Sequence, residues 1–415
     1  MKKDIIIDKE NSVSIKACGD KLELVRNTET TKTGARIFQN GKILSSSFVG
    51  NIKDEEIIKL AQDNPETAVP YEYDLIDPKA VNESHISPHF NKKEFLEEFR
   101  KVASDLSKKF PQFILKGQAE LSTTSRRLKH VDSSVEQYVE NNGCNWIFMY
   151  RHQNSKGLMD GYFAFEQKDR FTHKEEIEAY SEVLESFENN VKLTSKRYPV
   201  VFIDPYMGSL VTKIYESASI RSYRQEVGVF KGQLGAEILS PKFSMYDVSF
   251  DPERMIFSPF DGEGFVRENP RFPIVENGVF KNLYADCRWG HKYDLATTGN
   301  GKRSYNTEIN LSPHSTLIAA GQRSYKEILA DLPECIAIEV SAGDNFSEPG
   351  EYSAPVQNAY FYKNGKLQGR CPQLTVVTHI KKMFGEDLIE IASDSFISKK
   401  ANPAIFMEAD VMIHS

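Results

Sequence analysis

The stretch "DKLELVRNTETTKTGARIFQNGKILSSSFVG", residues 20–50, alternates apolar and polar side chains on both sides of Asn40-Gly41. Alternation with a period of two predicts strands that bury one face. Asn-Gly is the dipeptide that most readily supplies the two positive φ angles of a type I′ turn, so the stretch is predicted to be a β-hairpin. The same dipeptide occurs at Asn142-Gly143, Asn277-Gly278 and Asn364-Gly365. Antiparallel hairpins are therefore expected in both halves of the chain.

Three segments carry apolar side chains at helical spacing and are predicted to be helices packed on these sheets. They are residues 91–110, 172–187 and 204–218. The second begins with Thr172 and Glu175, which is the pattern of a capping box. The third begins with an Asp-Pro pair, which supplies an N-cap and a first-turn proline, and its apolar stripe is expected to enter a core. Hairpins and helices together predict an α+β protein.

The length of 415 residues exceeds one ordinary domain and predicts two. Residues 190–199 are polar, lose the helical period and end at a proline before a strand-like run, which is typical of a domain boundary. We therefore expect an N-terminal α/β domain of hairpins and packed helices over residues 1–195. A C-terminal, β-rich domain is expected over residues 196–415.

Composition limits the location and the partners of the protein. The first apolar run, Ile5 to Ile7, is too short for a signal peptide, and no window has the length of uncharged apolar sequence that a membrane helix needs. Five widely separated cysteines indicate neither a disulfide framework nor a zinc knuckle. The net charge of -7 opposes binding to nucleic acid. We therefore expect a cytoplasmic protein with no membrane or direct nucleic-acid partner.

Two short motifs are candidates for chemistry. In "FDGEGF", Asp261 and Glu263 alternate with Gly262 and Gly264, which fits a sharp turn whose carboxylates cap neighbouring amides, because a metal site would need more oxygen ligands. In "DCRWGHKY", residues 286–293, a thiol and an imidazole four residues apart would share one face of a helix and could act as nucleophile and base. The simpler reading of Cys287 and His291 is a packed thiol and a surface histidine.

Taken together, the motifs of residues 258–315 resemble the TldD/PmbA family, known as modulators of DNA gyrase. The specific feature is their order: an acidic glycine turn, an arginine, I-x-E-N-G-V, a tyrosine-containing helix, T-T-G-N and N-x-x-L-x-P. Other stretches are similar to the family's first hairpin, central strands, last hairpin and final strand, so the resemblance spans nearly the whole chain. It implies an N-terminal α/β domain, a C-terminal domain of curved, mostly antiparallel sheet, and dimers around an internal chamber.

The family contains TldD-like chains, which bind a catalytic metal through HExxxH and a cysteine near the C-terminus, and TldE/PmbA-like chains, which lack these ligands. Counting back from "FKGQLG", residues 230–235, aligns "VTKIYE" with HExxxH. Val211 then replaces the first histidine, Thr212 replaces the glutamate base, and Glu216 replaces the second histidine. Residues 200–230 contain no histidine, and no cysteine follows Cys371. The resemblance therefore implies a TldE/PmbA-like subunit with no metal or catalytic residues of its own.

The implied function is that of a non-catalytic partner in a cytoplasmic metallopeptidase complex acting on unfolded peptides. Its TldD-like partner would carry the divalent metal, zinc by expectation, and strand addition would help to hold the peptide. Two alternatives stay open, namely a stand-alone homodimer that binds peptides without cutting them, and a peptidase with unrecognised residues such as Cys287 and His291. The resemblance also implies a set of structural or peptide-binding residues: Phe230, Gly232, Gly235, Asp261, Gly262, Glu263, Gly264, Arg267, Asn277, Gly278, Gly299 and Asn300.

Overall fold

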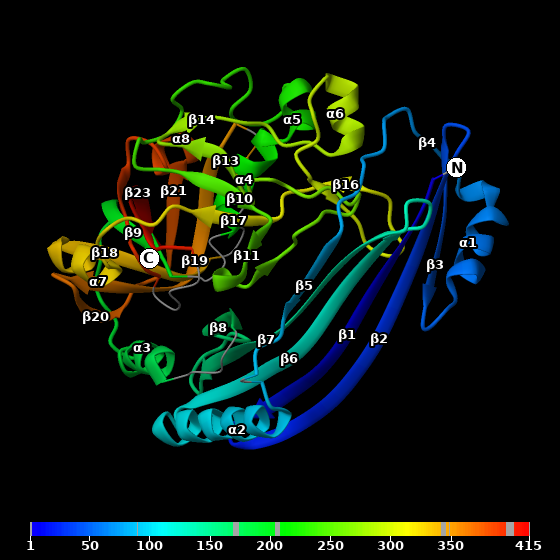
Figure 1. Ribbon diagram of the computed structural model, residues 1–415. Helices are drawn as coiled ribbons and strands as arrows, with labels where there is room; N and C mark the ends of the chain where they lie inside the picture. Colours follow the sequence, from blue (N-terminus) through cyan, green and yellow to red (C-terminus); the bar gives the residue numbers. More distant parts are fainter. Residues whose placement is uncertain are drawn as a thin grey trace.

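A computed structural model describes residues 2–88, 90–168, 174–203, 208–341, 346–347, 349–395 and 402–414. Within these residues the protein is α+β, and its sheets are mostly antiparallel. Four long, curved strands run beside one another and extend away from the more compact remainder of the chain (Figure 1). They are β1 (Lys2–Cys18), β2 (Lys21–Gln39), β6 (Phe113–His130) and β7 (Val135–His152).

These long strands form the centre of an eight-stranded sheet within the described part of the chain. Its order is β4-β3-β2-β1-β6-β7-β5, with β8 paired to β7. The outer strands are β3 (Lys42–Val49), β4 (Val69–Pro70), β5 (Val81–His85) and β8 (Gly161–Lys168). Helix α2 (Lys92–Lys109) packs on β1 and β6, and α1 (Asp54–Gln62) packs on β2 and β3 (Figure 1). A short 3₁₀ turn (Pro65–Thr67) and α3 (Lys174–Glu185) complete this part.

The second large sheet closes its strand path, because β18 pairs with both β9 and β19. Its strands are β9 (Lys196–Phe202), β18 (Glu334–Ser341), β19 (Glu351–Lys363), β20 (Lys366–Arg370), β21 (Leu374–His379), β22 (Leu388–Ile391) and β23 (Ile405–Ile413). A smaller sheet contains β14 (Val279–Phe280), β13 (Arg271–Glu276), β10 (Met245–Val248) and β17 (Ser315–Ile318).

Short elements connect and cover these sheets. Two small ribbons are formed by β11 (Phe250–Asp251) with β12 (Ile256–Phe257), and by β15 (Gly301–Lys302) with β16 (Asn310–Leu311). The helices are α4 (Gly208–Ala218), α5 (Ile220–Arg224), α6 (Cys287–Tyr293), α7 (Tyr325–Asp331) and α8 (Ile380–Met383), with a 3₁₀ turn at Pro252–Arg254. The predicted α+β class is confirmed, whereas the division at residue 196 stays a prediction.

Three of the four Asn-Gly pairs form the predicted hairpin turns. Asn40-Gly41 joins β2 to β3, and both residues have positive φ angles, 51° and 68°. The pairs that begin at Asn277 and Asn364 likewise join β13 to β14 and β19 to β20 with positive φ at both positions. At these three places the local backbone preference of the dipeptide agrees with the sheet around it.

The hairpin predicted at Asn142-Gly143 is wrong, because both residues continue β7 opposite Thr123 and Ser122 of β6. The Asn142 side chain is buried and holds the neighbouring segment: its Oδ1 accepts from the backbone N–H of Ser87 at 2.7 Å, and its Nδ2 donates to the Ser87 carbonyl at 3.1 Å. This tertiary contact takes the place of the local turn.

The predicted helices are present, and part of their capping is described. Helix α2 is capped by Asn91, whose side chain accepts from the backbone N–H of Lys93 at 2.9 Å. Helices α3 and α4 lie within the other two predicted ranges. Thr172, the Glu175 side chain and the Asp204-Pro205 pair lie outside the described residues, so their predicted capping roles stay predictions.

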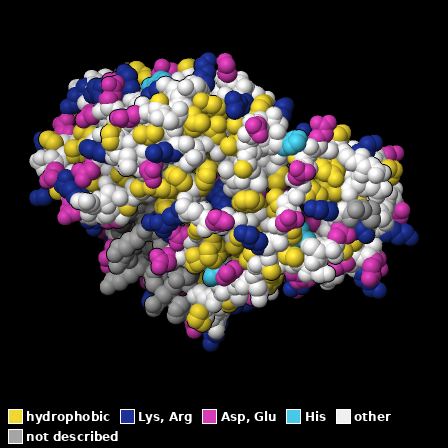
Figure 2. Space-filling view, turned by 45° about the horizontal axis from the view of Figure 1, so that its top comes forward, with side chains coloured by type: hydrophobic (Ala, Val, Ile, Leu, Met, Phe, Trp, Pro, Cys, Tyr) yellow, Lys and Arg dark blue, Asp and Glu magenta, His cyan; other side chains and the backbone are white. Residues whose placement is uncertain are grey.

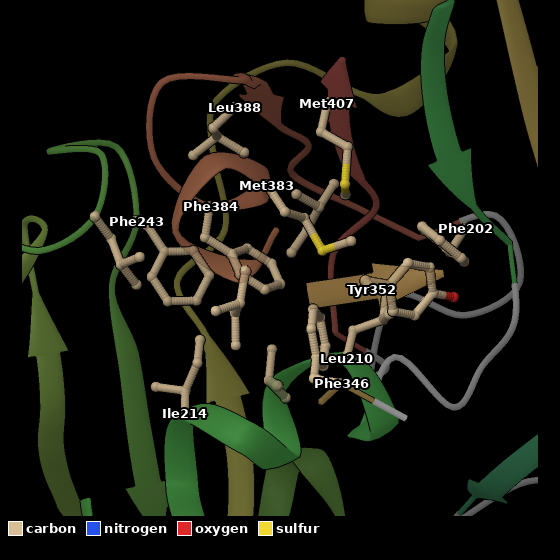
Figure 3. Packing of buried hydrophobic residues seen from close by; sticks show 14 of the residues in the cluster. Phe202, Leu210, Ile214, Phe243, Phe346, Tyr352, Met383, Phe384, Leu388 and Met407 are labelled. Atoms are coloured by element: carbon tan, nitrogen blue, oxygen red, sulfur yellow. The ribbon is translucent and has the colours of Figure 1, made fainter. Parts of the chain in front are cut away.

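The largest apolar core lies in the C-terminal half and contains the inward face of α4. Figure 3 shows Leu210 and Ile214 of that helix pointing toward Tyr352, Met383 and Phe384. A separate apolar cluster lies between α2 and the long strands, around Phe99. Each large sheet therefore has its own apolar packing.

The helices, the cysteines and the surface charges of the described residues show no unusual feature. No helix among the described residues is long and apolar enough to cross a membrane. All five cysteines are free thiols. On the face drawn in Figure 2, Lys and Arg side chains are interspersed with Asp and Glu, and hydrophobic side chains gather in separate patches between them.

Candidate functional site

The three α4 positions that the count from "FKGQLG" places at HExxxH have different surroundings. Val211 is fully buried, with 0% of its surface exposed, in the apolar core that also takes Leu210 and Ile214. Thr212 is exposed. Glu216 is also exposed, and its carboxylate lies 3.4 Å from the Lys213 ammonium. A metal at this helix would therefore compete with apolar packing on one side and with solvent on the other.

The described residues outside α4 form no metal-ligand cluster either. Among the described residues, no three His, Cys, Asp or Glu side chains are grouped in a way that could hold a metal ion. Structural and catalytic zinc sites need at least three such protein ligands. The described part of this chain thus offers no metal-binding geometry.

The "FDGEGF" segment is a tight turn built around one buried carboxylate. Oδ1 of Asp261 accepts the backbone N–H groups of Glu263 and Phe265, both at 2.9 Å. Oδ2 accepts the N–H of Gly301, also at 2.9 Å, which ties the turn to β15. Burial nevertheless raises the pKa of Asp261, although these N–H groups act in the opposite direction. The turn predicted from alternating acidic residues and glycines is thus present, with the caps that were expected.

This turn rests on the end of the N-terminal sheet. Phe260 packs in a small apolar cluster with Ile6 of β1 and Leu128 of β6. The Gln137 side chain donates to the Gly264 carbonyl at 2.9 Å. Gly264 has φ +90°, and a Cβ there would lie 2.7 Å from the His130 ring, so only glycine fits without displacement. The contacts join segments more than a hundred residues apart.

A buried ion cluster supports the same junction. Arg36 donates through Nε and Nη2 to the Asp4 carboxylate, with a shortest distance of 2.6 Å, and Arg303 donates through Nη1 to the other Asp4 oxygen at 2.6 Å. Although burial acts to raise it, the pKa of Asp4 falls to about 2 because both guanidiniums favour the carboxylate. Burial and the neighbouring Arg36 lower the pKa of Arg303 to about 10. All three side chains are almost completely buried.

A second network, largely buried, contains Arg267 and Asn300, two polar members of the set of residues that the resemblance implied. Arg267 Nη2 donates to Asp247 Oδ2 and to Asn300 Oδ1, both at 2.6 Å. Asn300 Nδ2 donates to the same Asp247 oxygen at 2.9 Å. The backbone N–H of His314 donates to the other Asp247 oxygen at 2.7 Å, and burial lowers the pKa of the His314 imidazole. In this chain these residues hold β10 to the loop before β15.

The other residues of the set implied by the resemblance lie in packing or turn positions. Phe230 is fully buried against Phe280, and the N–H of Gly235 donates to the Phe280 carbonyl at 2.7 Å. Gly232 is exposed with open space around it. The other three are turn residues with positive φ: Asn277, Gly278 and Gly299. The structure does not bring this whole set together around one cavity.

Two pockets lie on either side of the turn. One has a volume of about 230 Å³ and is lined by Asp4, Arg36, Glu263 and Cys287 among others. The second, about 310 Å³, lies near Phe260 and is lined mainly by polar strand residues. Most residues of β1, β2 and β6 that line the pockets are even-numbered, with Lys3, Lys9 and Ser125 as exceptions, and successive strand residues face opposite sides of a sheet. Both pockets therefore open on the same face of the N-terminal sheet.

Cys287 and His291 both belong to α6, as their spacing predicted, but their environments differ. Cys287 is buried, and its backbone N–H donates to the Glu263 carboxylate at 2.9 Å. Burial and the adjacent Glu263 raise the pKa of the thiol, which disfavours the thiolate that a nucleophile requires. The His291 side chain is exposed. The geometry favours the reading of a packed thiol and a surface histidine.

Sequence reasoning missed the charged partners from the N-terminal sheet. Arg36 is a single charged residue within the otherwise uncharged stretch "TGARIF", and this was an available signal for buried charge. Asp4 ends the charged run "KKD" before "III", so it gave no comparable signal. The pairing of Asp4 with Arg303 spans 299 residues, which no local pattern encodes. Asp247, which organises the second network, carried no recognisable motif.

Comparison with known proteins gives a family match over the C-terminal half. Residues 195–412 match the model of the PmbA/TldA metallopeptidase C-terminal domain. The fold is similar over 100% of this chain and 97% of the other chain to the crystal structure of TldE from Thermococcus kodakarensis, with a TM-score of 0.86 and 16% sequence identity. At that identity the likeness concerns the fold alone.

Two curated relatives come from Methanocaldococcus jannaschii. The uncharacterized protein MJ0231 is 27% identical over 179 residues, covering 43% of this chain and 39% of the relative. The metalloprotease MJ0996 is 27% identical over 144 residues, covering 34% of this chain and 32% of the relative. The chain thus matches less than half the length of these curated relatives.

Proposed function

Because this chain belongs to the PmbA/TldD metallopeptidase family, we propose that it is the non-catalytic, TldE/PmbA-like subunit of a cytoplasmic peptidase complex. A TldD-like partner that bears HExxxH and the Cys ligand supplies the divalent metal, zinc in our proposal. The present chain completes the dimer, encloses part of the peptide chamber and holds unfolded peptide in an extended form. It contacts neither nucleic acid nor a membrane in this role.

The observation that carries this proposal is the state of α4. Val211, at the position of the first motif histidine, fills the apolar core. Thr212 and Glu216, at the positions of the glutamate base and the second histidine, face solvent. A zinc peptidase needs its ligands and its base arranged around one open coordination position. This helix instead serves packing, which supports a partner role within a metallopeptidase family.

The sheet face around the turn supports the peptide-holding part of the proposal. The pocket near Phe260 is lined by short polar side chains, such as Thr30, Thr124 and Asn141, and by charged residues of both signs, such as Lys32 and Glu10. The short polar groups donate and accept hydrogen bonds without selecting one side chain. The neighbouring pocket beside Glu263 is lined by both charged and apolar groups. An extended peptide that crosses the turn would contact polar, charged and apolar groups in both pockets.

The test is reconstitution with a TldD-like subunit encoded beside this chain. The chain alone should hydrolyse no unfolded peptide, and the mixture should form a one-to-one complex that does. Replacing the partner's HExxxH glutamate by glutamine should abolish hydrolysis while leaving the complex intact, which assigns the chemistry to the partner. If the chain instead forms only a stable homodimer and never binds such a subunit, the proposed function is wrong and the stand-alone peptide-binding reading replaces it.

A further inference from the structure

The pocket beside the turn has the size and walls for one long side chain. Its volume of about 230 Å³ exceeds the roughly 150 Å³ of an apolar cavity that accommodates benzene. Phe38, Tyr73, Leu75 and Ile76 supply apolar surface on the β2 side and on the loop before β5. Glu263 lines the pocket from the turn. Four carboxyls line the pocket: those of Asp77 and Asp132 are exposed, that of Asp4 is buried and paired with arginine, and that of Glu263 is buried without an ion pair among the described residues.

Glu263 is a buried carboxyl without a cationic partner. It is only 8% exposed, and its hydrogen bond comes from the backbone N–H of Cys287 at 2.9 Å. Within the described part of the chain, no Lys or Arg forms an ion pair with it. Burial, together with the Asp261 carboxylate, raises the pKa of Glu263 to about 8. Asp286, beside Cys287, is also buried, and its Oδ2 has no hydrogen-bond partner.

The local charge balance favours a cation over an anion. Four buried carboxyls surround this region, on Asp4, Asp261, Glu263 and Asp286. The two buried guanidiniums, on Arg36 and Arg303, both pair with Asp4. Lys2 and Lys3 also line the pocket, but they lie at its more exposed part. At the buried end a ligand carboxylate would add negative charge beside Glu263, whereas an ammonium would replace the proton that Glu263 otherwise holds.

We propose that this pocket binds a lysine side chain of an extended peptide, with the ammonium on the Glu263 carboxylate and the methylene stem along Tyr73 and Leu75. Lysine fits because its apolar stem matches the apolar side chains of the pocket and its compact charge matches the Glu263 carboxylate. The inference rests on the proposed function only in taking the lysine from a peptide. The preference for an ammonium rests on the pocket alone.

Binding should couple to the protonation of Glu263. The groups nearest this carboxyl are Asp261 from its own turn, the α6 N-cap Asp286 with Cys287, and Arg36 and Tyr73 from the N-terminal part. The other charged or titratable groups that line the pocket are Lys2, Lys3, Asp4, Asp77, His130 and Asp132. Asp261 and Asp286 disfavour its ionisation, and Arg36 favours it. Since the ammonium needs the ionised form, affinity should fall about tenfold for each pH unit below 8. Above about pH 10 the ligand itself loses its charge.

The experiment titrates the intact chain with blocked pentapeptides, Ala-Ala-Lys-Ala-Ala and its norleucine and glutamate counterparts, followed by NMR shift changes at pH 9 and pH 6.5. At pH 9 the lysine peptide should bind at least about tenfold more tightly than the norleucine peptide, and the glutamate peptide most weakly. The preference should shrink about tenfold or more at pH 6.5. E263Q, which can still accept from the Cys287 N–H, should remove the preference, whereas the exposed neighbour E268Q should keep it.

A second variant covers the case in which E263Q fails to fold. L75W fills the pocket from a half-exposed position and should weaken the lysine peptide without touching the turn. Equal binding of the lysine and norleucine peptides, retention of the preference in folded E263Q, or no binding of any probe would overturn the proposal. These results do not depend on a TldD-like subunit, so a failure here and a failure of complex formation are separate outcomes.

Discussion

Replacing Asp4 by Asn should greatly lower the free energy of unfolding, because Asp4 lies at the junction between the N-terminal sheet and the turn. The substitution keeps the size of the side chain but leaves Arg36 and Arg303 buried without a counter-charge. Removing one partner of a buried ion cluster typically costs about 3–5 kcal/mol. The lowering of the Asp4 pKa from 3.8 to about 2 accounts for roughly 2.4 kcal/mol of this at neutral pH.

The matched control is Asp8→Asn on the same strand. Asp8 pairs with Arg126 at 2.7 Å, but the arginine and aspartate side chains keep 34% and 24% of their surface exposed. Its loss should cost only about 0.5–1 kcal/mol. Urea unfolding at pH 7, followed by both circular dichroism and fluorescence, measures the difference between the variants. Equal losses for the two variants would refute the reasoning about burial.

The pH dependence supplies an independent check on Asp4. Its pKa is lower in the folded protein, so its contribution is complete above the unfolded value of 3.8 and is lost as pH falls through about 2. The gap between wild type and Asp4→Asn should therefore narrow by roughly 1 kcal/mol between pH 7 and pH 3. A gap that stays constant over this range would mean that the cluster does not hold Asp4 ionised.

Three further substitutions or reactions separate packing from chemistry. Gly264→Ala should lower the free energy of unfolding by about 1–3 kcal/mol more than Gly232→Ala, because both glycines have positive φ but only a Cβ at residue 264 would meet a neighbouring ring. Thermal unfolding compares the two variants. Equal shifts in melting temperature would contradict the crowding at Gly264. Cys287 should react with iodoacetamide at pH 8 far more slowly than the less buried Cys18, because burial disfavours its thiolate. Peptide mass mapping measures both rates. Comparable rates would mean that α6 carries an accessible thiolate. Val211→His should destabilise the fold by about 2 kcal/mol or more, because it places a polar ring in the apolar core, and it should not raise the zinc content. Urea unfolding measures the stability and elemental analysis measures the zinc. A stable variant that gains one zinc would contradict the packing argument.

Local chemistry predicted those parts of the fold in which neighbouring residues decide the conformation. Asn40-Gly41 fixes a turn through its own φ preferences, and Asp261 caps amides within four residues of itself. Asn142 has the same dipeptide signal, yet it continues a strand because Ser87, distant in sequence, uses both ends of its amide. A local rule fails wherever a distant partner offers the same group a better hydrogen bond.

The buried ion cluster of the candidate site could not be predicted from local sequence either, because its members are also distant in sequence. Asp4, Arg36 and Arg303 come from three segments, and each would be an expensive buried charge by itself. Only their meeting makes burial tolerable, and a single sequence does not specify which distant charges meet. By contrast, the apolar stripe of α4 was visible in the sequence, because burial of Val211 follows from helical spacing alone.

The α4 positions that we propose as the vacant metal motif and the turn around Asp261 constrain the chain in different ways. On α4, a histidine at Val211 would exchange fully buried apolar contacts for a polar ring, so metal binding and core packing are opposed there. At the turn, the hydrogen bonds of Asp261 and the pocket carboxyl of Glu263 come from the same short segment, so stability and ligand binding share one piece of backbone. If the chain has the partner role that we propose, the absence of metal ligands on α4 would cost its core packing nothing. The chain cannot give up the turn without also losing the surface that we propose for peptide.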